Sequence, residues 1–161
     1  MWCSKVDKIK WCLKAKNGIE LVEPNSNLAE AYLKKAEDSL ETMRLAKSRD
    51  WKISTAYYTI YFSIYAILMR IGVKCEIHSC TIEFMKRFLS DDFDSQEQRF
   101  IEGSMKARID AQYFINRDVP DELYDDLIKK APWFLVKCKG VVIRMDERKR
   151  NKIRQEIMAC I

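Results

Sequence analysis

Residues 53–69 run for seventeen positions without a charged side chain, and no other segment limits the possible folds as strongly. Small hydroxyl residues recur every four positions along it, and so do tyrosines, at Thr55, Thr59 and Ser63 and at Tyr57, Tyr61 and Tyr65. At helical spacing, one face is small enough for a neighbouring backbone to approach, while the next presents aromatic rings with polar tips. The pattern predicts a helix that is buried on nearly every side.

A membrane span is the rival interpretation of this segment. Seventeen residues is about the shortest apolar stretch that crosses a bilayer, and hydroxyl groups and tyrosines are unusual in the middle of a span. Lys52 and Arg70 flank the segment, and Gly72 stands where a left-handed residue commonly ends a helix. We therefore expect a helix inside a globular fold and no membrane partner.

The composition favours one helical domain. Of the 161 residues, 48% are hydrophobic, which is enough for a full core, whereas four glycines and three prolines are too few for the turns of an all-β fold. Residues 1–8 lack the long apolar core of a secretory signal. We therefore expect a cytoplasmic protein.

Six cysteines are scattered along the chain, at Cys3, Cys12, Cys75, Cys80, Cys138 and Cys160. A chain of this length folds without disulfides, so reduced thiols are expected. Cys75, His78 and Cys80 have side chains that bind zinc, but the sequence has no second histidine and no Cys-x-x-Cys pair to complete a tetrahedral site. The prediction is a protein without a metal ion or another cofactor.

Apolar spacing and capping residues divide the chain into helices. The predicted helices cover residues 4–16, about 27–48, 51–71, about 79–89, about 95–116, and a last long element that starts at Pro120. Their predicted N-terminal caps are Asn27 with Glu30, then Asp50, Ser79 and Ser95. Pro132 should kink or divide the last element. The fold class is all-α, an antiparallel bundle of five or six helices.

Three of the predicted helices have an apolar face at steps of three and four residues. These faces are Trp2, Val6, Ile9 and Leu13; Ala29, Leu33, Ala36, Leu40 and Met43; and Phe100, Ile101, Met105, Ile109, Tyr113 and Phe114. All are predicted to point into the core. Tyr57 and Tyr61 are also assigned to the core rather than to base stacking, because their surroundings are uncharged.

The net charge of +5 arises entirely from residues 137–161, since basic and acidic side chains balance in the rest of the chain. The run Arg148-Lys149-Arg150 would attract a phosphate backbone and would lose that attraction in high salt. A solvated helix end is the more ordinary explanation for such a run. Nucleic-acid contact and a solvated surface both remain open at this point.

Several short motifs occur in a characteristic order. Ser54-x-Ala56-Tyr57-Tyr58 is followed by Tyr61-Phe62, Gly72, His78-Ser79 and Arg108-x-x-Ala111-x-Tyr113. Together they resemble the small HEPN-domain proteins of bacteria and archaea over about residues 28–140. We expect a single domain at residues 1–145 with this core, followed by a basic C-terminal helix or tail at 146–161.

The resemblance implies an up-and-down four-helix core in a homodimer, whose paired fifth helices face each other across a cleft that engages RNA or nucleotides. Many members of the family are metal-independent ribonucleases. In those, an arginine holds the phosphate, and a histidine that follows after four to six intervening residues transfers protons. Others pair with nucleotidyltransferases in toxin–antitoxin systems.

This chain departs from the catalytic pattern. The positions after Arg108 where the family has its histidine hold Tyr113, Phe114 and Ile115, and Gln112 stands where similar members often have an aspartate. A phenol with a pKa of about 10 is a poor general base at neutral pH. The candidate catalytic residues are Arg108, Tyr113 and the only histidine, His78. The candidate RNA or nucleotide contacts are Arg108, Asp110, Gln112, Arg148, Lys149 and Arg150.

Ordinary structural roles are alternatives for several of these residues. His78 can bond to the following turn, and Arg108 with Asp110 can form a solvated surface or an interface ion pair. The sequence thus supports three hypotheses. The first is a binding module that pairs with a nucleotidyltransferase, the second is a ribonuclease that uses Arg108 with His78 or Tyr113, and the third is a structural dimer without a ligand.

Overall fold

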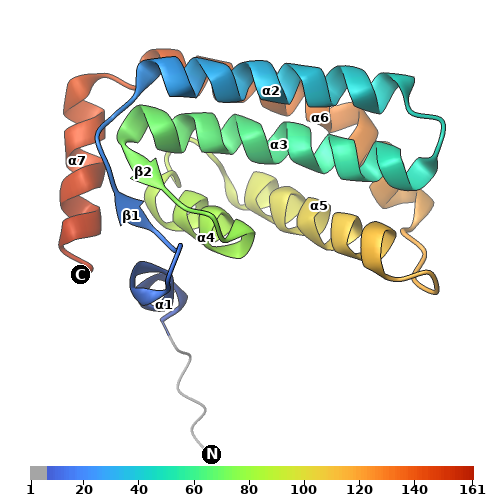
Figure 1. The fold of residues 1–161 in the computed structure, drawn as a ribbon, viewed down its shortest axis with the longest axis horizontal. Helices are drawn as coiled ribbons and strands as arrows, with labels where there is room; N and C mark the ends of the chain where they lie inside the picture. The colour runs from blue at the N-terminus through green and yellow to red at the C-terminus, as the bar shows by residue number, and fades with distance from the viewer. Residues whose placement is uncertain (1–6) are drawn as a thin grey trace, which may run out of the picture.

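The computed structural model describes residues 7–161 and contains, over that range, seven helices and one two-stranded sheet. Figure 1 shows their arrangement. The elements are α1 (Lys8–Lys14), β1 (Glu20–Leu21), α2 (Ser26–Leu45), α3 (Arg49–Ile71), β2 (Val73–Lys74), α4 (His78–Phe88), α5 (Ser95–Tyr113), α6 (Asp121–Arg144) and α7 (Glu147–Met158). The predicted all-α bundle is confirmed, and Trp2 and Val6 of the first predicted apolar face lie outside the described residues.

Helices α2, α3, α5 and α6 form the up-and-down core, and α3 lies at its centre (Figure 1). The central helix packs against α2, α5 and α6, because its uncharged sequence leaves no broad face for solvent. Ile53, Ile60 and Ile64 are fully buried, and Tyr57 and Tyr61 are only 1% and 7% exposed. The prediction that residues 53–69 form a helix buried on nearly every side is confirmed.

The two ends of α3 are set by local chemistry. Ser48 is the N-cap, and its hydroxyl accepts a hydrogen bond from the backbone N–H of Trp51. The predicted cap, Asp50, instead lies inside the first turn. Gly72 ends the helix with a φ of 87°, as predicted, because only glycine adopts this left-handed conformation without strain.

The predicted caps of three other helices are wrong by one or two residues. Asn25, rather than Asn27, caps α2 and accepts from Leu28 N–H at 2.9 Å. Ile77 rather than Ser79 precedes α4, and its apolar side chain cannot accept a hydrogen bond. Asp94, rather than Ser95, begins α5 in a capping box with Glu97. Neighbouring Asn, Ser and Asp residues have similar capping power, so tertiary packing decides between them.

The last long helix begins after Pro120, as predicted, but Pro132 does not divide it. Residues Asp121–Arg144 form one continuous helix that contains this proline. Proline removes one backbone donor from a helix interior. Burial of Leu127, Ala131 and Phe134 along the same helix stabilises it against that loss.

The buried face of α5 agrees with the predicted one in part, since Ile101 is buried and Phe100 and Met105 pack against the core as predicted. Ile101, Ser104 and Ala107 are its buried residues, whereas Tyr113 and Phe114 at its C-terminal end are 69% and 37% exposed. Small side chains let α5 approach α3 closely, so the larger apolar residues lie at the edges of the contact. The end of α5 therefore presents aromatic rings to solvent.

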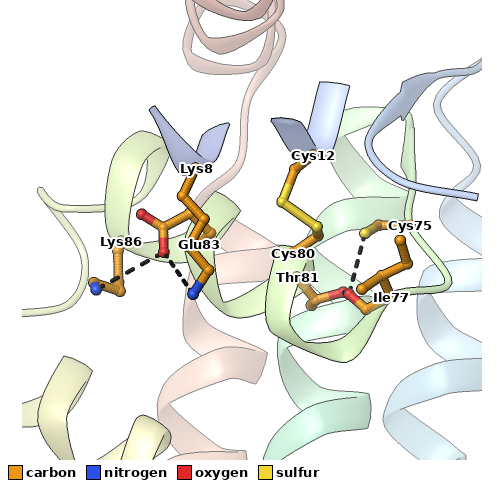
Figure 2. The surroundings of a disulfide bond; sticks show 8 residues. All are labelled: Lys8, Cys12, Cys75, Ile77, Cys80, Thr81, Glu83 and Lys86. Carbon is orange, nitrogen blue, oxygen red and sulfur yellow. Dashed lines mark hydrogen bonds and ion pairs between the residues drawn. A yellow bond between two sulfur atoms is a disulfide. The ribbon is translucent and has the colours of Figure 1, made fainter. Parts of the chain in front are cut away.

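A disulfide between Cys12 of α1 and Cys80 of α4 corrects the expectation of reduced thiols (Figure 2). The two residues are 68 positions apart in the sequence. Because both sulfur atoms are used, Cys80 has no thiolate to offer a zinc ion beside Cys75 and His78. Cys75, Cys138 and Cys160 are free, and the first two are buried. None of the described helices is long and apolar enough to cross a bilayer.

Candidate functional site

Arg108, on the second turn from the C-terminal end of α5, lies against the aromatic side of α3. Its guanidinium is 5.0 Å above the ring of Tyr57 and 5.8 Å from that of Tyr58, which are cation–π distances. Nη1 donates a hydrogen bond to Oε1 of Gln112 at 2.9 Å. Nε is buried and has no hydrogen-bond partner among residues 7–161. The side chain is thus held in place while part of its donor capacity is unused.

His78, the first residue of α4, is fixed by two tyrosines of α3. Its Nδ1 shares a hydrogen bond of 2.7 Å with the hydroxyl of Tyr57. Its ring stacks on Tyr61 with 3.9 Å between the centroids and 5° between the planes. The role predicted as the structural alternative, bonding to the following turn, is not the one seen, because His78 bonds back to the central helix.

Arg108, His78, Tyr57 and Tyr61 form one group, here named the Arg108–His78 cluster. Burial, together with the positive charge of Arg108, lowers the pKa of His78 below its usual value. Burial raises the pKa of the Tyr57 and Tyr61 hydroxyls, and for Tyr57 the charge of Arg108 partly opposes this. At neutral pH the cluster therefore holds one fixed cation, one neutral imidazole and protonated phenols.

Tyr113 and Gln112 lie next to this cluster, and although Gln112 also bonds to Arg108, both border a separate space. They line a groove of about 370 Å³ between the end of α5 and the start of α3, where Trp51 and Ser54 form the opposite wall. Asp110, another predicted contact, forms an ion pair with Arg117 at 3.3 Å. The structure therefore joins Arg108 to His78 and Gln112, and it places Tyr113 in the groove.

The basic run Arg148-Lys149-Arg150, on α7, lies far from the groove. Helix α7 stands at one end of the core, whereas the groove lies at the other, where α3 begins and α5 ends (Figure 1). Lys149 is engaged by the carboxylate of Asp92, at 2.7 and 2.8 Å, and Arg148 is exposed. Nε of Arg150 is buried and finds no acceptor in the described part of the chain. The tail and the cluster are thus two separate candidate surfaces.

Sequence reasoning missed the roles of four residues in this region. Tyr57 and Tyr61 are in the core, as predicted, yet they also hold the histidine. Trp51 and Ser54 had no assigned role, although Ser54 belongs to the motif that supports the resemblance. The signal that could have found Tyr57 is its four-residue spacing from Tyr61, which places both rings on one helix face.

The arrangement suits recognition of an anion. A partly desolvated guanidinium with idle N–H donors binds the oxygen atoms of a phosphate strongly. Aromatic rings beneath it keep it in one orientation, which lowers the entropy lost on binding. Over residues 7–161, no three His, Cys, Asp or Glu side chains lie close enough together to hold a metal ion.

Comparison with known proteins identifies the family. The family model described as the HEPN domain matches residues 27–141, which is most of the chain and contains α3 to α5 and nearly all of α2 and α6. A search of curated proteins found no relative that matches the chain. The matched segment includes Arg108, His78, Tyr57 and Tyr61, as well as the groove. The chain therefore belongs to the HEPN family and is a nucleotide- or RNA-related helical module.

Proposed function

We propose that this protein binds RNA or a nucleotide through the Arg108–His78 cluster and acts as the toxin-side or accessory partner of a nucleotidyltransferase. The observation that carries the proposal is the state of Arg108. Its guanidinium is oriented by Tyr57 and Gln112, yet its buried Nε has no acceptor among the described residues. A phosphate oxygen supplies the missing acceptor, and the positive charge favours that ligand over a neutral one.

Binding is favoured over cleavage because the usual proton carrier of the family is absent. Tyr113 replaces it, and its side chain is 69% exposed in the groove. The imidazole of His78 is half-buried, and its Nδ1 is already engaged by Tyr57. A site with a fixed cation, whose neighbouring imidazole is already held by a tyrosine, favours binding of a phosphodiester over its cleavage.

A ribonuclease is the second candidate, and the closeness of His78 to Arg108 favours it. The charge of Arg108 helps to lower the pKa of His78, so the imidazole is neutral and can accept a proton at neutral pH. When Nδ1–H donates to the hydroxyl of Tyr57, Nε2 is the atom that accepts it. In this alternative His78 activates the ribose hydroxyl while Arg108 holds the phosphate.

The two functions are separated by incubating the full-length protein with a mixture of RNAs and measuring binding and cleavage together. The proposal predicts intact RNA and a loss of binding of about tenfold or more in Arg108→Ala, since one charge-assisted contact is removed. Arg117→Ala is the matched control, because Arg117 is an exposed arginine in the loop that follows the same helix. Robust cleavage that Arg108→Ala abolishes would support the ribonuclease and overturn the binding module.

The homodimer and the nucleotidyltransferase are parts of the same proposal. Exposed aromatic and aliphatic side chains just after α5, namely Phe114 and Ile115, support a contact surface there. Size-exclusion chromatography with light scattering tests the dimer, and co-purification with a nucleotidyltransferase encoded beside this protein tests the partner. A monomer that binds neither RNA nor such a partner contradicts the proposal. A dimer with no ligand would leave the structural hypothesis in its place.

Asp110, Gln112 and the basic run Arg148-Lys149-Arg150 stay predicted contacts. The ion pair with Arg117 leaves Asp110 less available than Gln112, whose amide is one helical turn from Arg108. If the basic run contributes, its effect is electrostatic and falls steeply with salt. Replacing Arg148 and Arg150 with glutamine then reduces the salt dependence of RNA binding, whereas Arg108→Ala reduces affinity at every salt concentration.

A further inference from the structure

We infer that the groove between the start of α3 and the end of α5 is a nucleobase pocket, in which Trp51 and Tyr113 stack on the flat faces of a base. This inference rests on the proposed function, because the base would belong to the nucleotide whose phosphate Arg108 binds. It gives Trp51, Ser54 and Tyr113 a role in base binding, which is separate from the proposed contact of Arg108 with the phosphate.

Two aromatic side chains from different helices line this groove while remaining open to solvent. Trp51 is 61% exposed and Tyr113 is 69% exposed, and the space of about 370 Å³ beside them is large enough for a base with its sugar. Large aromatic side chains exposed on both walls of one groove are the stacking surfaces that single-stranded nucleic acids and nucleotides use. The rings therefore favour a flat heteroaromatic ligand.

An unpartnered hydroxyl in the same groove independently indicates a ligand. Three other hydroxyl residues of α3 donate to the preceding helical turn, Thr55 to Trp51, Thr59 to Thr55 and Ser63 to Thr59. Ser54 is only 1% exposed, and its Oγ has no partner within residues 7–161. Such a buried polar group costs free energy unless a ligand satisfies it. A ring nitrogen or exocyclic group of a base would do so.

The remaining polar groups fit the edge of a base and its phosphate. Gln112 lines the groove and accepts a hydrogen bond from Arg108 through Oε1, so its amide N–H groups remain available to a ligand. Asp50 adds a carboxylate acceptor to the opposite wall. Arg108 lies one helical turn before Gln112 and donates to its Oε1 at 2.9 Å, although Arg108 itself does not line the groove. One nucleotide can therefore place its base in the groove and its phosphate on Arg108.

The test uses phosphate-free ribonucleosides, mononucleotides and ribose 5-phosphate, titrated into the full-length protein by calorimetry. Wild type is expected to bind at least one nucleoside, and Trp51→Ala to weaken that binding about 5- to 150-fold, the range for loss of one base stack. Trp133→Ala is the matched control, because Trp133 is 52% exposed on α6 and does not line the groove. Equal nucleoside affinity in wild type and Trp51→Ala overturns the pocket.

Ser54→Ala separates a ligand role from a structural one. Removing the unpartnered hydroxyl should leave the melting temperature unchanged or raise it, while nucleoside affinity falls about 2- to 12-fold. Thr59→Ala is the control, since the Thr59 hydroxyl is satisfied within the helix. Unchanged affinity in Ser54→Ala contradicts this part of the inference.

Failure of the pocket is distinguishable from failure of the proposed function. Arg108→Ala should keep nucleoside affinity and lose only the extra affinity that a phosphate adds. If Arg108→Ala changes nothing while Trp51→Ala loses the nucleoside, the phosphate role of Arg108 fails and the pocket stands. If Trp51→Ala changes the oligomeric state but not nucleoside binding, the groove is an interface between two copies, and the pocket is overturned.

Discussion

The two ends of the helical core use arginine in opposite ways. At the end where α3 finishes, Nη1 of Arg154 donates to the carbonyl oxygens of Val22, Ile71 and Gly72, at 2.8, 3.2 and 2.9 Å. Near the end where α3 begins, Arg108 makes one hydrogen bond, to Gln112, and its Nε has no acceptor in the described region. Figure 1 shows that α7, which carries Arg154, lies at the first of these ends.

The difference shows that an arginine can either stabilise the fold, as Arg154 does, or remain a candidate binding group, as Arg108 does. Arg154 donates to the carbonyls of Ile71 and Gly72 at the C-terminal end of α3 and to that of Val22 after β1, so its donors serve the fold. Arg108 lies within a helix whose carbonyls are already paired, so its donors are free for another acceptor. Changes at the α7 end should therefore reduce stability, and changes at the groove end should reduce binding.

Removal of the disulfide should have the largest effect on stability. Cys12→Ser combined with Cys80→Ser opens the covalent link between α1 and α4. Because the link spans 68 positions, its loss should reduce the free energy of unfolding by about 4 kcal/mol. Urea unfolding of the oxidised protein and the double variant measures this difference.

Cys160→Ser is the control for the disulfide, since Cys160 is a free, half-buried thiol near the C-terminus. It should unfold at nearly the same urea concentration as wild type. If the double variant also matches wild type, the link does not stabilise this end of the molecule.

The next largest effect concerns two glycines, of which Gly72 has no room for a side chain and Gly103 has room for one. At Gly72, with a φ of +87°, an added Cβ would lie 2.5 Å from the oxygen of Val22 and 2.8 Å from the nitrogen of Pro24. Gly72→Ala should therefore cost about 3 kcal/mol, combining left-handed strain with overpacking. Thermal unfolding followed by circular dichroism measures the loss.

Gly103→Ala in α5 is the matched substitution. Its added Cβ would meet only Cδ1 of Leu123, at 3.9 Å, which is an ordinary contact. Alanine in a helix interior is favoured over glycine, so this variant should gain about 0.5–1 kcal/mol. A loss at Gly103 as large as that at Gly72 would show that the two positions do not differ as described.

The arginine pair tests the comparison directly. Arg154→Ala removes charge-assisted bonds to three carbonyl groups, and we expect a loss of about 2 kcal/mol in the free energy of unfolding. Arg108→Ala removes one side-chain bond and should cost only about 0.5 kcal/mol, while it weakens RNA binding. Equilibrium unfolding should show the larger loss of stability in Arg154→Ala. RNA-binding measurements should show the larger loss of affinity in Arg108→Ala. Equal stability losses would contradict the division between the two ends.

The smallest effect is the pH dependence contributed by His78. Its pKa in the folded protein is lower than the ordinary value of 6.5, so both states are neutral above that value. As pH falls below 6.5, the unfolded chain binds the proton first, and stability decreases until the folded protein is protonated as well. His78→Gln should remove this decrease, as measured by unfolding at a series of pH values.

Because the chain has one histidine, nuclear magnetic resonance of its ring protons reports this pKa without overlap. In Arg108→Ala the pKa should rise toward its ordinary value, since one cause of the lowering is removed. Arg117→Ala should leave it unchanged. If the pKa of His78 is the same in Arg108→Ala as in wild type, the charge of Arg108 does not act on His78 as described.

Much of the fold could be predicted from residue spacing, while the exact caps could not. The uncharged run, the apolar steps of α2 and Gly72 gave the central pair of helices and the end of α3. Asn25, Ser48 and Asp94 proved to be the caps because each lies where the packed helix begins, and several nearby residues have similar capping preference. The paired cysteines also depended on how α1 packs against α4.

The candidate site was predictable in part. The motif indicated Arg108, and the count of following residues indicated the missing histidine. The contact of His78 with Tyr57 was not predictable, because it joins residues that are 21 positions apart through the packing of α4 on α3. Trp51 and Ser54 carry no chemical signal of their own until α5 places Tyr113 and Gln112 opposite them.

The sequence by itself determined the helical class, the buried central helix and the family, because these depend on periodicity and on the order of short motifs along the chain. Only the tertiary structure decided which polar groups are satisfied. Arg154 and Arg108 are the same residue type on helical segments, yet one meets three carbonyl groups and the other keeps an unpaired Nε within the described residues. Hydrogen bonds require angstrom-scale placement of groups distant in sequence, and packing alone supplies it.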